Sequence, residues 1–231
     1  MKEMIMNMPM MLALTVGSYL LGVWARRKSG LSMLHPFLIS VPVVVAVLNA
    51  TDVPCEFYIE SNVVIDFFLC PCVVALGLLL YDHREIIRRN LLGILSAVAA
   101  GSVVGVASVY ALCRLLKLNE IFLLSLEPKS VTAPIAIEIS SYLGGDLSLT
   151  AVSVVLCGFI GAVLGPAFLR LLRIKSPIAR GLAMGASSHG LGTARAIEMG
   201  AVEGAVSGLA IALMGVMTAL VIPLFNAIAG L

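Results

Sequence analysis

Long apolar stretches, each about the length of a membrane-spanning helix, recur along the whole chain. They cover residues 4–24, 34–50, 63–81, 91–113, 147–169 and 205–231. A helix that crosses a bilayer needs about 20 predominantly apolar residues. The pattern therefore predicts an all-α polytopic membrane protein with about six spanning helices.

Composition supports the membrane prediction. The 231 residues are 60% hydrophobic and 12% charged, with a mean hydropathy of +1.07, whereas soluble domains carry roughly 25% charged residues. The net charge of +2 without a basic stripe argues against nucleic acid as a partner. We expect a single membrane domain with several spans.

Two segments interrupt the apolar pattern with polar residues and glycines, at 129–144 and 181–200. An ionisable side chain at the centre of a membrane helix costs about 2.5–3.5 kcal/mol on insertion scales, and it usually faces a cavity or a partner. Glycines break a helix and leave backbone groups free to meet a ligand. Both segments are predicted to be re-entrant or broken helices that bind something. For 181–199, a polar loop between two helices is the alternative.

The basic residues predict how the chain is oriented. The clusters at 26–28 and 84–89 are separated by two spans, so they share one side, which the positive-inside rule makes cytoplasmic. Four basic residues between 170 and 180 reach the same side if the segment 121–144 enters and leaves through one face. The charge count therefore favours a re-entrant segment, although two basic residues directly after the stretch 91–113 then lie outside.

The two polar segments contain similar motifs. Residues 132–138 read TAPIAIE, and residues 193–198 read TARAIE. Each motif is followed by an apolar stretch with a glycine and then a proline, namely Gly158 and Pro166, then Gly215 and Pro223. Because one span separates the motifs, we interpret them as an inverted repeat, the arrangement in which half-helix ends of secondary transporters meet a substrate. A chance match in a chain rich in alanine and isoleucine is the alternative.

A half-helix N-terminus offers unpaired N–H groups and the positive end of a dipole, so it binds a carboxylate or phosphate well. An arginine adds a permanent charge and a bidentate donor fork. The predicted substrate-binding residues are Ser130, Thr132, Ser188, His189, Gly190, Gly192, Thr193 and Arg195. The residues predicted to carry a coupling proton or cation are His189, Glu138 and Glu198.

Each of these assignments has a simpler alternative. Arg195 and Glu198 are three residues apart and could pair with each other on one helix. His189 could be a packing residue, and Glu138 could face water at the interface. Lys129 is expected to extend to the membrane surface.

The chain is not expected to be an enzyme or to hold a metal or cofactor. Ser188 and His189 are neighbours in sequence, which is not the geometry of a nucleophile and its base. The Cys70-Pro71-Cys72 stretch lacks the second pair of ligands that a metal site needs.

Three stretches resemble signature segments of the LrgB/CidB family: KSVTAPIAIEIS at 129–140, GAVLGP at 161–166 and ARGLAMGASSHGLGTARAIEMG at 179–200. Length and the order of the apolar stretches also fit, whereas residues 1–113 carry no such motif. The family signature points to Lys129, Ser130, Thr132 and Pro134 in the first motif and to Ser188, His189, Gly190, Gly192, Thr193, Arg195 and Glu198 in the second.

The resemblance implies a multi-pass protein of the bacterial cytoplasmic (inner) membrane and two alternative functions. The family was first described as holin- and antiholin-like proteins that modulate the export or activity of murein hydrolases, and so autolysis. Plastid relatives are glycolate/glycerate transporters, and bacterial relatives acting with a small LrgA-type partner are linked to pyruvate uptake.

We predict coupled alternating-access transport of small monocarboxylates, and the alternative is holin- or antiholin-like modulation of autolysis. Residues 1–118 would form a scaffold and residues 119–231 the transport core. The expected partners are the carboxylate, a coupling proton or cation, an LrgA-type protein and further copies of the chain.

Overall fold

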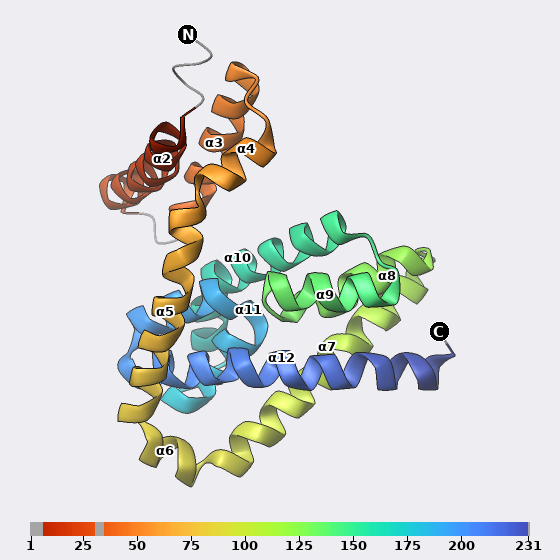
Figure 1. Cartoon of the computed structure of the whole chain (residues 1–231). Helices are drawn as coiled ribbons and strands as arrows, with labels where there is room; N and C mark the ends of the chain where they lie inside the picture. Colours follow the sequence, from red (N-terminus) through yellow and green to blue (C-terminus); the bar gives the residue numbers. More distant parts are fainter. Residues whose placement is uncertain (1–6, 31–34, 231) are drawn as a thin grey trace. The chain divides into compact units, whose positions relative to one another are not determined.

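The computed structural model describes residues 7–30 and 35–230, without the side chains at positions 69, 70 and 73. Three of the predicted apolar stretches, 4–24, 34–50 and 205–231, begin or end outside this part of the chain. The Cys70 side chain, named in the sequence analysis, also lies outside it. Helices account for all regular secondary structure in the described residues (Figure 1). They are α2 (Met8–Ser29), α3 (Phe37–Thr51), α4 (Cys55–Ser61), α5 (Val63–Asp82), α6 (Arg84–Arg89), α7 (Leu91–Leu115), α8 (Glu120–Leu126), the 3-10 helix η1 (Glu127–Ser130), α9 (Ala133–Leu143), α10 (Leu147–Leu171), α11 (Pro177–Met199) and α12 (Ala201–Ala229).

Four helices within the described residues are long and apolar enough to cross a membrane: α2, α7, α10 and α12. Helix α3 is a shorter apolar helix, and α5 extends over 20 residues. The prediction of an all-α polytopic membrane protein is confirmed.

Contacts divide the chain into two compact units, Met1–Ala75 and Leu76–Leu231. In the first unit, α2 packs against α3 and α4, and the Ser18 and Ser40 hydroxyls are 2.9 Å apart between α2 and α3. In the second unit, α7 packs against α12. By its contacts, α7 belongs with the helices that follow it, whereas the sequence analysis placed it in the scaffold of residues 1–118. The functional division near residue 118 stays a prediction.

The segment from α8 to α9 forms a hairpin. The two helices have 7 and 11 residues, or about 10 and 16 Å at 1.5 Å per residue, and a bilayer core is about 30 Å thick. The backbone N–H of Asp146, just after α9, donates to the Ser125 hydroxyl of α8 at 2.7 Å. The chain that leaves α9 therefore returns to α8, as a re-entrant segment requires.

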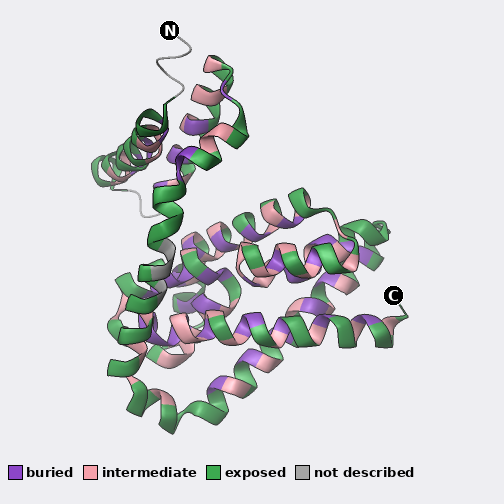
Figure 2. Ribbon diagram, viewed as in Figure 1, coloured by how far each residue is buried: buried purple, intermediate pink, exposed green. Residues whose placement is uncertain are grey.

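Helix α11 is broken at His189, whose backbone has φ 38° and ψ −123°. Eight of its residues are buried, including Ser188, His189 and Thr193; buried positions are drawn in purple in Figure 2. The alternative that this segment is a polar loop is therefore wrong. The two halves approach so closely that a Cβ at Gly192 would overlap the Met184 carbonyl, so the break needs glycine at 192.

Helix α11 packs against both α10 and α12. On one side, a side chain at Gly161 of α10 would overlap the Ser188 hydroxyl. On the other, a side chain at Gly185 of α11 would overlap the Ser207 carbonyl of α12. Small residues at such interfaces let membrane helices approach closely, and here they enclose the broken helix on two sides.

Both repeated motifs follow a break in helical structure. Val131 and Thr132 are extended, and Thr132 is the N-cap of α9. Thr193 lies four residues after the break at His189. Pro166 and Pro223 lie inside α10 and α12, the helices that follow. Each motif thus follows a helix break and precedes a helix with an internal proline. The inverted relation of the two motifs stays a prediction.

Candidate functional site

The two breaks meet inside the second unit. The His189 ring donates from Nε2 to the Lys129 carbonyl oxygen of η1 at 3.3 Å, and the two residues are 60 positions apart in the chain. A Cβ at Gly158 of α10 would lie 2.9 Å from Cε1 of this ring. Gly158 therefore makes room for the His189 ring, and the predicted convergence of the two motifs is present.

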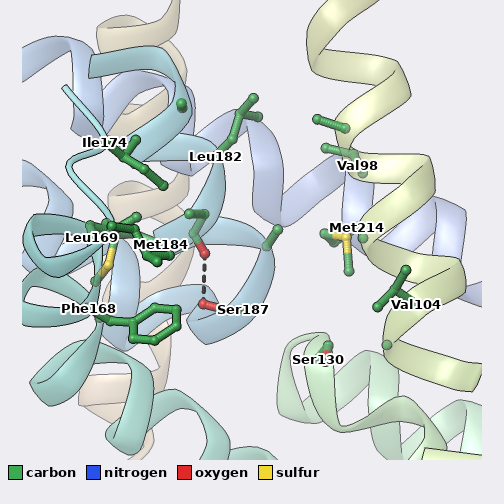
Figure 3. Close-up of a pocket in the computed structure, with 18 residues that line it drawn as sticks. Val98, Val104, Ser130, Phe168, Leu169, Ile174, Leu182, Met184, Ser187 and Met214 are labelled. Atoms are coloured by element: carbon green, nitrogen blue, oxygen red, sulfur yellow. Dashed lines mark hydrogen bonds between the residues drawn. The ribbon is translucent and has the colours of Figure 1, made fainter. Parts of the chain in front are cut away.

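A cavity of about 600 Å³ lies next to this meeting point (Figure 3). Its walls come from α7, η1, α10 with the loop after it, α11 and α12. The lining residues are Ala97, Val98, Gly101, Val104, Gly105, Ser130, Gly165, Phe168, Leu169, Leu172, Ile174, Ala179, Leu182, Ala183, Met184, Ala186, Ser187 and Met214. Sites for small molecules usually measure about 300–1,000 Å³ and are mostly apolar, so size and lining suit a small ligand.

The polar side chains of this lining are those of Ser130 and Ser187, one from each broken segment. The Ser187 hydroxyl donates to the Ala183 carbonyl at 2.7 Å, the dashed line in Figure 3. It also lies 2.9 Å from the Ser188 hydroxyl. The lining can thus contact the apolar body of a ligand and offer hydroxyls to its polar end.

Lys129 does not line the cavity itself, but it places a positive charge next to Ser130, which does. Its ammonium group donates to the Ser130 hydroxyl at 3.4 Å, and the residue is half-buried. Within the described part of the chain, no acidic side chain forms a recorded salt bridge with Lys129. The sequence had placed this side chain at the membrane surface, and the structure places it beside a residue of the site.

Arg195 is not among the residues that line the cavity. Its guanidinium forms an ion pair with Glu198 on the same helix, and the two side chains are 25% and 48% exposed. The simpler alternative for this pair is confirmed. Glu138 is exposed on α9 and does not line the cavity either.

The other predicted residues lie near the break but make contacts within the protein. Ser188 is fully buried, and the Thr193 hydroxyl lies 2.7 Å from that of Ser207 on α12. Gly190 is exposed, and the Thr132 side chain makes no capping hydrogen bond. Of the predicted set, the structure brings Ser130 to the cavity and Ser188 and His189 next to it; the binding roles of the rest stay predictions.

Several residues around the break were not among the predicted substrate-binding or coupling residues, although the family signature pointed to Lys129. They are Lys129 and Ser187, the glycines Gly158, Gly161 and Gly165, and the buried pair of Glu127 and Asn226. The stretches EPKS and GAVLGP contain four of the seven. The sequence of these stretches alone does not show which of their side chains face the cavity and the neighbouring helices.

These observations define a class of protein: an all-helical, multi-pass membrane protein in which two broken segments meet beside a cavity. The chain belongs to the LrgB-like family, which it matches over residues 15–228.

Two relatives come from Bacillus subtilis. The chain is 38% identical over 204 residues to the uncharacterized protein YxaC, covering 88% of this chain and 89% of that protein. It is 33% identical over 218 residues to the antiholin-like protein LrgB, covering 94% and 93%. The comparison with solved structures found no match.

Proposed function

We propose that the protein transports small monocarboxylates of the pyruvate, glycolate and glycerate class across the bacterial cytoplasmic membrane by alternating access. The observation that carries this proposal is the cavity of about 600 Å³, to which both broken segments contribute a hydroxyl. Paired broken segments next to a central site are typical of secondary transporters.

The chemistry of the cavity fits a small organic acid. Apolar side chains such as Phe168 and Met214 contact the carbon body of the substrate. A carboxylate that leaves water needs charged or hydrogen-bonding partners. The Lys129 ammonium group and the Ser130 hydroxyl, 3.4 Å apart, provide a charge-assisted site for it.

The first test removes the Lys129 charge. In Lys129→Gln, the KM for pyruvate or glycolate should rise roughly 10- to 100-fold, because a hydrogen bond to a charged group contributes about 1.5–3 kcal/mol. The measurement is uptake of labelled substrate into proteoliposomes. Lys175→Gln, at an exposed position after α10, is the matched control and should keep the wild-type KM. A Lys129→Gln protein with unchanged KM contradicts this site.

A second function is supported by the comparisons more directly than transport is. The relative with 33% identity is named an antiholin-like protein, so an antiholin-like modulator of autolysis is the second candidate, acting with an LrgA-type membrane partner. The cavity favours transport, and altered carboxylate flux could itself change autolysis.

Vesicles that contain the protein, with and without an LrgA-type partner, separate the two candidates. Transport predicts saturable uptake and retention of a trapped dye. A holin- or antiholin-like pore activity predicts dye release, or its suppression, without saturable uptake.

A further inference from the structure

A glutamate and an asparagine from distant parts of the chain form a buried pair. Glu127 begins η1 and is 1% exposed, and Asn226 lies near the end of α12 and is 5% exposed. The Asn226 amide donates from Nδ2 to Glu127 Oε2 at 2.9 Å. Neither residue lines the cavity of the proposed transport site.

The other two oxygens of this pair are also buried. Within the described residues, Glu127 Oε1 and Asn226 Oδ1 have no hydrogen-bond partner. Both are acceptors, so they cannot bond to each other unless one of them carries a hydrogen. Buried polar atoms without partners are rare and costly, so this pair requires an explanation.

Among the described residues, no basic side chain forms a salt bridge that would compensate a charge on Glu127. Lys129 is bonded to Ser130 instead. Among the ionisable side chains on helices packed against η1, Cys113 of α7 interacts electrostatically with Glu127, Cys157 of α10 interacts with Lys129, and His189 of α11 is hydrogen-bonded to the Lys129 carbonyl. A buried carboxylate without a cation is far less stable than the neutral acid.

A single proton on Glu127 would account both for the two oxygens without partners and for the missing cation. A proton on Glu127 Oε1 removes the charge and supplies the hydrogen that Asn226 Oδ1 lacks. With the existing bond from Nδ2 to Oε2, the acid and the amide can then form the two-bond pair in which each group donates once and accepts once.

The pair is positioned to affect the cavity. Glu127 and Ser130 are the two ends of η1, which spans four residues; Ser130 lines the cavity, and the Lys129 carbonyl accepts from His189. If Glu127 loses its proton, repulsion between acceptor oxygens weakens the bond that joins η1 to α12. Ser130 and Lys129 would then move with the same short helix.

A small second cavity offers a route for the proton. It measures about 50 Å³ and is lined in part by Cys113 and Glu120, enough for a single water molecule or little more. Glu120 is exposed, and the Cys113 thiol is close enough to Glu127 to interact with its charge. Glu127 is not among the described residues that line this cavity, so a proton that leaves its carboxyl has to pass the Cys113 side chain before it meets water there, and it leaves a carboxylate behind.

We propose that Glu127 and Asn226 form a proton-binding site, in which a neutral glutamic acid exchanges its proton as η1 moves. Its role as the group that couples proton movement to substrate uptake rests on the proposed transport function; the existence of the site does not.

The site is tested first without any substrate. Infrared difference spectra of the full chain in lipid, recorded across a pH series, should show the C=O band of a protonated carboxyl in the wild type. Glu127→Gln should remove the band and still fold, because an amide at 127 can form both hydrogen bonds with Asn226. Glu85→Gln, at an exposed position on α6 that has no part in the proposed site, should keep it.

A second measurement needs no variant. A hydrophobic carbodiimide adds to protonated carboxyl groups, and mass spectrometry of the labelled wild type should place the adduct on Glu127. A band that persists in Glu127→Gln together with no adduct at Glu127 would overturn the site. Sodium binding that is lost in Glu127→Gln, without a protonated carboxyl band, would instead make it a cation site and overturn the proposal.

The coupling role is tested in proteoliposomes. Glu127→Gln should lose accumulation driven by a proton gradient and retain exchange of labelled for unlabelled substrate, since exchange needs no net proton movement. Accumulation equal to the wild type would refute the coupling role. If the wild type takes up no carboxylate, the transport function and the coupling role both fail, and the spectroscopic result still decides the proton site.

Discussion

At the scale of single residues, His189 combines an unfavourable backbone with a buried, hydrogen-bonded ring. Its φ of 38° with ψ −123° is a conformation that residues other than glycine rarely adopt, and such strain costs about 1–3 kcal/mol. The ring meets the Lys129 carbonyl and fits against Gly158. The sequence predicted a break within 181–200, whereas the structure places it at His189 and shows that the partners of the ring come from two other helical elements.

This combination predicts an unusual order of stabilities. His189→Gly should be more stable than His189→Ala by about 1 kcal/mol or more, because both lose the ring but glycine accepts the positive φ. At His83, where φ is −104°, alanine should instead be at least as stable as glycine. Thermal unfolding midpoints in detergent measure both pairs. An alanine variant at 189 that matches or exceeds the glycine variant would show that the backbone there is not strained.

At the scale of elements, α11 depends on glycines at its contacts with α10 and α12. A side chain at Gly185 would overlap the Ser207 carbonyl, and a backbone carbonyl cannot move aside as a flexible side chain can. The sequence predicted that glycines interrupt this segment. It did not show which of them are packing contacts, because that depends on the neighbouring helix.

The packing role is tested with a glycine pair. Gly185→Ala should lower the free energy of unfolding by about 1–3 kcal/mol, the usual cost of overpacking. Gly93→Ala in α7, where an added Cβ would meet no atom within 4 Å, should leave the free energy of unfolding unchanged or raise it by up to about 1 kcal/mol, because alanine favours the helical conformation more than glycine does. Equal effects at the two sites would contradict the contact between α11 and α12.

At the scale of the whole molecule, the hairpin of α8, η1 and α9 decides which side of the membrane later segments reach. It lies between α7 and α10, both 25 residues long and able to span. Because the backbone N–H of Asp146, just after α9, meets Ser125 of α8, we expect the hairpin to return to the face from which it starts and the loops after α7 and α10 to lie on opposite sides. The sequence predicted this only from the balance of basic residues.

Labelling of single cysteines from each side tests this topology. In a cysteine-free background, Lys175→Cys should react from the same, cytoplasmic side as Glu85→Cys, since basic clusters favour the cytoplasm. Lys117→Cys, in the loop after α7, should react from the opposite side. Reaction of Lys117→Cys and Lys175→Cys from one side would mean that the hairpin crosses the membrane.

The sequence by itself determined the helical membrane class, most of the spans and the two places where helices break. Hydropathy over about 20 residues and local runs of glycine, proline and hydroxyl residues specify these features, so distant contacts are not needed to predict them. Tertiary structure decided which charges matter. Arg195 pairs with Glu198 on its own helix, Lys129 bonds to Ser130 at the cavity wall, and Glu127 meets a partner 99 positions away. The stability of a buried charge depends on the groups that surround it in space, and helix packing brings those groups together.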